Sequence, residues 1–218
     1  MMTTTPANDY TFLLSYCGVP KRQVQETQAL LGKIDIFNLP ENESAYLHGS
    51  AGTGKTIAAI ALMFDSLSKN KHVKYVMKKF NVLNDEFDPH GPEDLRYLYV
   101  RTPDVLSQIR ATFDKKKQRN HADEQGDEQE TERSIIKKYS EVDFLVLDDL
   151  GVEKITDWSF TVLYLIIDNR YNNYKQTVIT SNDTLDELAK KLGEDRIPSR
   201  ICGMCTTVDM NGNDYRLK

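Results

Sequence analysis

Eight consecutive residues, Gly49 to Thr56, have the types and spacing of a phosphate-binding loop, because they satisfy the pattern G-x-x-x-x-G-K-[ST]. Glycines let the backbone wrap closely around an anion, and the amides of the loop and of the following helix point at the phosphates. We expect Lys55 to reach the β- and γ-phosphates of a nucleoside triphosphate and the Thr56 hydroxyl to ligate Mg²⁺. The alternative is a glycine-rich turn with a surface lysine. The predicted nucleotide-binding residues of this loop are Gly49, Ser50, Ala51, Gly52, Thr53, Gly54, Lys55 and Thr56.

Two carboxylates form the second chemical element. Asp148 and Asp149 follow the apolar run Val142–Leu147, which predicts a buried strand and resembles a Walker B segment. In open α/β sheets ligands bind at the carboxyl ends of the strands. We therefore expect Asp148 to hold Mg²⁺ and Asp149 to orient and deprotonate the attacking water. A strand that merely ends in a polar turn would have the same pattern.

Two further polar groups follow along the chain. Thr180-Ser181-Asn182 ends the next short apolar strand, where Asn182 is placed to hold the lytic water in the manner of a sensor 1 residue. Such a triplet is also an ordinary helix-capping turn. Arg196 and Arg200 lie four residues apart and are either surface charges or groups that reach the γ-phosphate of a neighbouring subunit.

The elements that position these residues alternate between strand and helix. Strand patterns end at His48, Met77, Arg101, Leu147, Thr180 and Met210, and helical patterns follow most of them, including Pro103–Phe113, Thr156–Asn173 and Thr184–Leu192. Alternation of this kind predicts an α/β fold with a mostly parallel sheet between two layers of helices. Residues 78–94 have the composition of an insertion, and the almost entirely charged residues 114–132 that of a solvated loop or an exposed helix extension.

Composition limits the class of protein. The chain has 218 residues, 39% hydrophobic and 28% charged, with a net charge of −5, which argues against nucleic-acid binding by overall basicity. No apolar run approaches the roughly 18 residues of a membrane span, and nothing at the N-terminus is typical of a secretion signal. We therefore expect a cytoplasmic protein without membrane contact. Three cysteines, two of them in Cys202-Gly203-Met204-Cys205, are too few for a disulfide framework and are expected to be reduced.

The order of several motifs resembles the DnaC/IstB family of AAA+ ATPases, which contains bacterial helicase loaders and transposition helper proteins. The resemblance extends from about Cys17 to Arg216. The motifs that carry it, besides the phosphate loop, are Gly18-Val19-Pro20-Lys21-Arg22, Asp148–Glu153, Trp158, Asp168-Asn169-Arg170-Tyr171, Thr180-Ser181-Asn182, Arg196–Arg200 and Asn213-Asp214-Tyr215-Arg216.

The resemblance implies an AAA+ three-layer fold with a five-stranded sheet and no C-terminal lid, in residues 44–218. Residues 1–43 would be a short N-terminal segment, disordered at first and then helical, that could contact a partner; it is shorter than the recognition domain of many relatives. By motif, Lys55 and Thr56 belong to Walker A, Asp148 and Asp149 to Walker B, and Asn182 to sensor 1. Arg200 would be the arginine finger, Arg196 a second contact in trans, and Arg216 sensor 2.

Three functions remain open from the sequence. The first is an ATP-hydrolysing helicase loader or helicase-remodelling factor, slow or partner-stimulated, which forms a hexameric or helical homo-oligomer and contacts a replicative helicase and single-stranded DNA. The second is a transposition helper ATPase with a transposase as partner. The third is a nucleotide-dependent interaction module with little hydrolysis. The basic residues best placed to contact DNA are Arg101, Arg110, Lys115, Lys116, Lys117 and Arg119.

Overall fold

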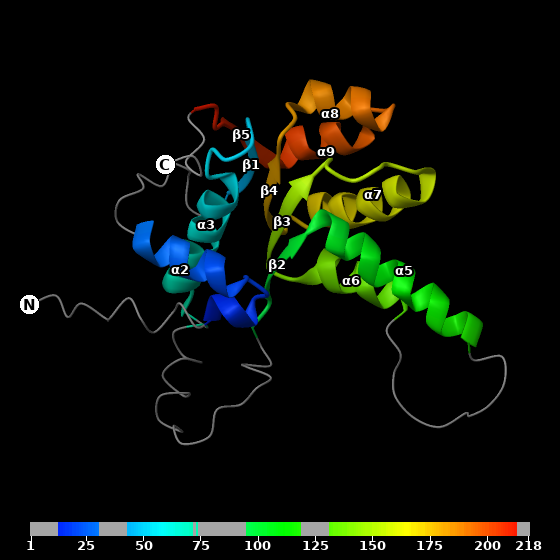
Figure 1. Cartoon of the computed structure of the whole chain (residues 1–218), viewed down its shortest axis with the longest axis horizontal. Coiled ribbons are helices and arrows are strands. Elements are labelled where there is room, and N and C mark those ends of the chain that lie inside the picture. Colours follow the sequence, from blue (N-terminus) through cyan, green and yellow to red (C-terminus); the bar gives the residue numbers. More distant parts are fainter. Residues whose placement is uncertain (1–12, 31–42, 72, 74–94, 119–130, 213–218) are drawn as a thin grey trace, which may run out of the picture.

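Five parallel strands form the sheet at the centre of the structure, a computed structural model that describes residues 13–30, 43–71, 73, 95–118 and 131–212 (Figure 1). Their order across the sheet is β2-β3-β4-β1-β5, and neighbouring strands pair in parallel. The predicted five-stranded α/β fold is therefore confirmed. The strands are β1 (Ser44–His48), β2 (Tyr97–Arg101), β3 (Phe144–Leu150), β4 (Gln176–Ser181) and β5 (Cys205–Asp209).

Helices cover both faces of the sheet, so the molecule has three layers (Figure 1). One face carries α2 (Lys21–Leu30) and α3 (Lys55–Lys69). On the other face lie α5 (Thr102–Gln118), α6 (Glu132–Glu141), α7 (Asp157–Asn172), α8 (Leu185–Leu192) and α9 (Arg196–Met204).

Alternation along the strands creates two hydrophobic cores, because successive side chains of a strand point to opposite faces. In β1, Ala45 and Leu47 pack in the core beneath α2 and α3, whereas Tyr46 packs in the core beneath the other helices. In β3, Val146 belongs to the first core and Leu147 to the second. Burial on both faces of the sheet explains why β3 is apolar without alternation from Phe144 to Leu147.

Threonines begin three of the helices on the second face. Thr131, Thr156 and Thr184 are the N-caps of α6, α7 and α8, and each forms a reciprocal capping box with the residue three positions later. Gly193 ends α8 in the left-handed conformation, with φ of 74°. The predicted start and end of α8 are confirmed.

The structure differs from the sequence prediction in two places and decides between two expectations in a third. Residues 114–118 continue α5 as a helix, which agrees with the helix extension expected as the alternative to a solvated loop. The residues from Arg196 to Met204 form a helix that was not predicted. Pro198 is tolerated there because it lies in the first turn of α9, where its missing amide costs no intrahelical bond. Val73, the described residue of the expected strand ending at Met77, is helical. The expected insertion at 78–94 lies outside the described residues.

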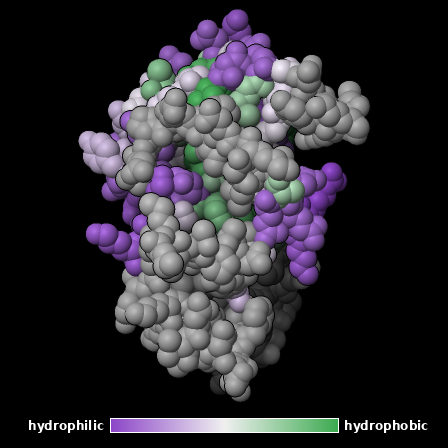
Figure 2. All heavy atoms as spheres, turned by 90° about the vertical axis from the view of Figure 1, so that its left-hand side faces the viewer, coloured by the Kyte–Doolittle hydropathy of each residue, from purple (hydrophilic) through white to green (hydrophobic). Residues whose placement is uncertain are grey.

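Among the coloured atoms of the face in Figure 2, hydrophilic residues lie at the top and at both sides, and hydrophobic residues are visible near the middle. In the described part of the chain, no helix combines the length and apolar character needed to cross a membrane.

Candidate nucleotide site

The phosphate loop connects β1 to α3, in the strand–loop–helix order that the sequence predicted. Gly52 and Gly54 have φ of 82° and 90°, so both use the left-handed region that glycine favours. Gly49 has no room for a side chain, because a Cβ atom there would lie 2.8 Å from the carbonyl carbon of Met210. The Lys55 ammonium is buried and donates to the carbonyl oxygens of Gly49 at 2.8 Å and Ser50 at 2.7 Å.

Thr56 and Asp148, the two residues predicted to hold Mg²⁺, touch each other directly. The Thr56 hydroxyl donates to the two carboxylate oxygens of Asp148 at 2.9 and 3.2 Å. Hydroxyl and carboxylate oxygens are ligands that suit Mg²⁺, which binds proteins through one or two carboxylates and takes its remaining ligands from phosphates and water. This pair of oxygens fits such an ion, although the described residues contain no cluster of three or more acidic, His or Cys side chains.

A bulge at the end of β3 places the two aspartates opposite a single residue of β4. The register shifts between the Leu147–Ile179 and Leu150–Ser181 pairs, so Asp148 and Asp149 together face Thr180. The Thr180 hydroxyl donates to Asp148 at 2.6 Å and accepts the backbone N–H of Asp149 at 2.9 Å. Asp149 has φ of 59°, a left-handed conformation that Asp adopts more readily than most residues. The bulge therefore turns consecutive carboxylates to different environments.

Tyr99 supplies another hydroxyl to Asp148, from the neighbouring strand β2. The phenol donates to Asp148 Oδ2 at 2.7 Å, and burial together with the Asp148 charge raises the pKa of Tyr99. Asp148 is 1% exposed and accepts hydroxyl hydrogen bonds from Thr56, Tyr99 and Thr180. Sequence analysis missed the roles of Tyr99 and Thr180, since hydrogen bonds between different strands leave no local pattern.

Asn182 follows the last residue of β4 and is exposed. Strand β4 lies between β1 and β3 in the sheet. Asn182, just after β4, therefore lies between the phosphate loop that follows β1 and the two aspartates of β3. The strand order thus brings the predicted Walker A, Walker B and sensor 1 segments to one edge of the sheet.

Arg196 and Arg200 lie on α9 and stack on aromatic residues of α7. The Arg196 guanidinium lies 5.1 Å from the ring centres of both Phe160 and Tyr164 and pairs with Glu194 at 2.6 Å. Arg200 lies 5.0 Å from the ring of Tyr171 and pairs with Asp168 at 2.6 Å. Both predicted trans-acting arginines are thus held on α7 within the subunit. Arg216, the predicted sensor 2, lies outside the described residues.

Arg170, a member of one of the family-like motifs, has a structural position. It is fully buried and donates to Thr177 Oγ1 and to the carbonyl oxygens of Tyr139, Ser140, Val142 and Gln176. Desolvation lowers its pKa to about 9. These bonds join the end of α6 to the starts of β3 and β4, on the side of the sheet away from the phosphate loop.

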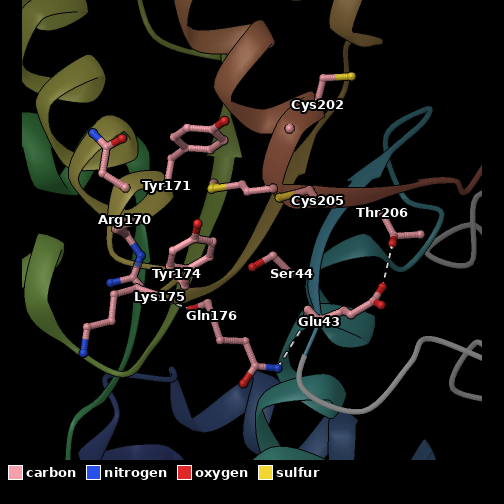
Figure 3. Close-up of a pocket in the computed structure, with 13 residues that line it drawn as sticks. Glu43, Ser44, Arg170, Tyr171, Tyr174, Lys175, Gln176, Cys202, Cys205 and Thr206 are labelled. Atoms are coloured by element: carbon pink, nitrogen blue, oxygen red, sulfur yellow. Dashed lines mark hydrogen bonds between the residues drawn. The ribbon is translucent and has the colours of Figure 1, made fainter.

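A cavity of about 560 Å³ lies at the amino ends of β1, β4 and β5 (Figure 3). Figure 3 shows Glu43 between Gln176 and Thr206, bonded to the first through its carbonyl and to the second through its carboxylate. Cys202 and Cys205 line the same cavity and are free thiols, as is Cys17. Burial raises the pKa of Cys205 to about 12. Because phosphates are expected at the carboxyl ends of the strands, this cavity is separate from the candidate nucleotide site.

Comparison with known proteins identifies relatives of this chain. Residues 109–218 match the family described as IstB-like ATP binding protein, a range that includes Asp148 to Arg200 and leaves out the phosphate loop. The replicative helicase loader DnaC of Escherichia coli K12 is 24% identical over 168 residues, which are 77% of this chain and 54% of that protein. DnaC of Buchnera aphidicola is 26% identical over 121 residues, or 56% of this chain and 45% of that protein. The chain spans about half the length of these curated relatives.

Solved structures agree with the fold. A crystal structure of the DnaC helicase loader superposes with a TM-score of 0.53 at 23% identity, covering 86% of this chain and 88% of that one. AMPPCP-bound DnaA from Aquifex aeolicus superposes with a TM-score of 0.53 at 21% identity, covering 87% of this chain and 47% of that one. The expected three-layer AAA+ fold is confirmed by this likeness.

Proposed function

The chain belongs to the family of IstB-like ATP binding proteins, and from this premise we propose that it is an ATP-hydrolysing AAA+ protein that loads or remodels a replicative helicase. One observation carries the catalytic part of the proposal. The Thr56 hydroxyl of the phosphate loop bonds directly to Asp148, while the bulge after Asp148 separates Asp149 from it. A cation-binding pair and a second carboxylate thus lie at the same edge of the sheet.

The residues of the phosphate loop and of the neighbouring strand ends have separate roles in this proposal. The amides of Gly52 to Thr56 surround the phosphates, and the Lys55 ammonium moves from the Gly49 and Ser50 carbonyls to the β- and γ-phosphates. Thr56 and Asp148 hold Mg²⁺, which neutralises charge that develops on the phosphate oxygens. Asp149 accepts the proton of the attacking water, and Asn182 holds that water from the β4 side.

The ATP site is completed in trans in this proposal. Arg200, supported by Arg196, contacts the γ-phosphate bound to the adjacent subunit of an ATP-dependent homo-oligomer, a hexamer or a helical assembly. To do so, Arg200 leaves Asp168 and the face of Tyr171. Assembly would then activate a slow ATPase. Arg216 would contact the nucleotide as sensor 2.

The partners follow from the relatives. The curated relatives are named as replicative helicase loaders, so we assign a replicative helicase as the main protein partner. Single-stranded DNA is a second ligand and is contacted by the basic residues of α5. The assembly with helicase and DNA is cytoplasmic. The family description, IstB-like, favours a transposase as the alternative partner.

ATP turnover tests the catalytic proposal. The wild-type chain should hydrolyse ATP, faster when single-stranded DNA is present. Lys55→Ala should lose nucleotide binding, whereas Asp149→Asn should bind ATP normally and lose at least about 100-fold in turnover, the usual minimum for a general base. Asp65→Asn is the matched control, because Asp65 lies on α3 and pairs only at the surface with Lys69. A wild-type chain that binds ATP with no turnover under any of these conditions would overturn hydrolysis and favour the interaction module.

Co-purification tests the choice of partner. The tagged chain is mixed with ATP and either a purified replicative helicase or a purified transposase. Retention of the helicase in an ATP-dependent manner, with Lys55→Ala as the control that cannot bind nucleotide, is the expected result. Retention of the transposase alone would replace the helicase-loader proposal with the transposition helper.

A further inference from the structure

The segment of the chain from Thr180 to Lys191 holds the turn that carries Asp149. Three consecutive residues of the turn each bond to this segment. The N–H of Asp149 donates to Thr180 Oγ1 at 2.9 Å, the carbonyl of Leu150 accepts from Ser181 Oγ at 2.7 Å, and the carbonyl of Gly151 accepts from Lys191 Nζ at 2.9 Å. The first two partners belong to β4, whereas Lys191 reaches back from the last turn of α8.

Lys191 joins two loops that flank the candidate site. Its ammonium also pairs with Asp183 at 2.5 Å, one residue after Asn182. Asp183 is itself held in place, because its N–H donates to Ser181 Oγ at 3.1 Å and its carbonyl accepts from the Tyr46 hydroxyl at 2.7 Å. One ammonium group therefore bonds to the turn after Asp149 and to the residue after Asn182.

The turn has two residues with left-handed backbones, and Asp149 is the one that needs a restraint, because glycine adopts a positive φ readily. Asp149 has φ of 59° and Gly151 has φ of 89°. At Gly151 a Cβ atom would lie 2.9 Å from Asp183 Oδ2 and 3.2 Å from Leu188 Cδ1, so the turn packs directly against the start and body of α8. Conformations of this kind persist when surrounding contacts fix them.

We infer that Lys191 is a positioning residue, which fixes the Asp149 carboxylate relative to Asn182 by bonding to Gly151 and Asp183. This role rests on the proposed ATP hydrolysis, because it concerns the geometry of the two groups that act on the water. The bonds of Lys191 go to the Gly151 carbonyl and the Asp183 carboxylate, so in this role it acts through the turn, and its loss slows turnover and leaves nucleotide affinity unchanged.

Three variants test the inference. Lys191→Met keeps an unbranched side chain about as long as the lysine stem and removes the charge and the donor, and Lys191→Arg restores both. Lys190→Met removes an exposed lysine from the adjacent position of α8 and is the matched control. We expect kcat to fall about tenfold in Lys191→Met, the effect of losing one charge-assisted hydrogen bond, with KM unchanged, and to recover at least in part in Lys191→Arg.

Amide hydrogen exchange gives a second measurement that does not depend on hydrolysis. In the protein without nucleotide, the Asp149 amide should exchange about tenfold faster in Lys191→Met than in wild type. Amides of α3 and the melting temperature serve as internal controls.

The outcomes separate this inference from the proposed function. Absence of ATP turnover in wild type and in Lys190→Met would overturn the proposed function, and exchange at Asp149 would still decide whether Lys191 orders the turn. Exchange and kcat in Lys191→Met equal to wild type would overturn the inference while leaving the ATPase in place. Equal losses in Lys190→Met and Lys191→Met, or a kcat loss matched by a fall in melting temperature, would reduce Lys191 to a structural residue.

Discussion

At the scale of single residues, the carboxylates of Asp148 and Glu153 are both buried but have different surroundings. Asp148 is 1% exposed and accepts hydrogen bonds from hydroxyls of Thr56, Tyr99 and Thr180, which offset the cost of removing a carboxylate from solvent. Glu153, at the far end of the same turn, has both carboxylate oxygens buried without a normal hydrogen bond to the described residues. Hydrogen bonds therefore compensate for the burial of Asp148, whereas burial disfavours the charged form of Glu153.

The Glu153 carboxyl should make folding stability depend on pH. Burial raises its pKa, and the nearby amides of Gly151 and Glu153 oppose the shift only in part. The folded state therefore binds this proton more tightly than the unfolded chain does. The contribution to stability is complete below the ordinary Glu pKa of about 4.3 and is lost as the pH rises through the raised value.

Glu153→Gln removes this dependence, because the amide keeps the shape of the side chain and carries no charge. We expect the melting temperature to rise by about 2 to 4 °C at neutral pH and to equal that of wild type near pH 4. Thermal unfolding measured between these two pH values checks the prediction. Glu141→Gln is the control, since the Glu141 side chain is 55% exposed. A constant difference between Glu153→Gln and wild type across the range would contradict the proposed ionisation cost.

At the scale of elements, local patterns predicted most of the fold. The apolar run Val142–Leu147 indicated β3, and the observed strand begins two residues later and extends to Leu150. Thr156–Asn173 indicated α7, and the observed helix is Asp157–Asn172 with Thr156 as its N-cap. These predictions succeed because burial and capping are recorded in consecutive residues.

The N-cap of α7 can be tested by substitution. Thr156 Oγ1 accepts the N–H of Ser159 at 3.2 Å, and Ser159 Oγ accepts the N–H of Thr156 at 2.7 Å. Thr156→Ala should reduce the free energy of unfolding by about 1 kcal/mol, because it leaves a first-turn N–H without its partner. Chemical denaturation monitored by circular dichroism gives the change.

Thr161→Ala is the matched control in the same helix. Thr161 is exposed and donates to the Asp157 carbonyl, so its replacement by a better helix former should be neutral or slightly stabilising. Equal destabilisation by the two substitutions would show that the cap contributes nothing specific.

Other elements could not be predicted because their causes are not local. The helix α9 carries Pro198 and two arginines and lacks a long apolar face of its own, yet Ile197 and Ile201 are buried in the core beneath α7 to α9. The bulge at Asp148 and Asp149 depends on Thr180, which is more than thirty residues away. Lys191 reaches Gly151 over a similar separation. The sequence indicated the two candidate carboxylates, but tertiary contacts decide how each is oriented.

At the scale of the whole molecule, the basic residues predicted to contact DNA have divided roles. Arg101 forms a bidentate pair with Asp104, and Arg110 lies 5.0 Å from the Trp158 ring centre. Both arginines thus have partners within the subunit. Lys115, Lys116 and Lys117 lie in the last part of α5, whose side of the molecule is opposite the α2–α3 layer (Figure 1).

Replacing Lys115, Lys116 and Lys117 together by Glu should weaken single-stranded DNA binding and leave ATP binding intact. If all three lysines contact phosphates, the plot of log affinity against log salt concentration should become shallower by about 2, since each contact to a single strand contributes about 0.7. Fluorescence anisotropy of a labelled oligonucleotide at several salt concentrations measures the slope. Lys154→Glu, at an exposed lysine between β3 and α7, is the control for a lysine-to-glutamate charge reversal elsewhere on the surface. An unchanged slope would exclude these lysines from the DNA-binding surface.

The final prediction concerns the site that two subunits would share. In a single subunit, Arg200 is bound to Asp168 and Tyr171 on α7, and in the proposed function it serves the Asp149 site of the neighbouring chain. In a head-to-tail assembly each junction takes its base from one chain and its finger from the next. Asp149→Asn and Arg200→Ala should each be inactive alone. When the two variants are mixed in equal amounts, half of the chains have an intact Asp149 and the other half an intact Arg200. About a quarter of the junctions then combine an intact Asp149 with an intact Arg200, so ATP turnover should return to about a quarter of wild type. Matching melting temperatures would exclude misfolding, and a mixture as inactive as its parents would show that Arg200 does not act in trans.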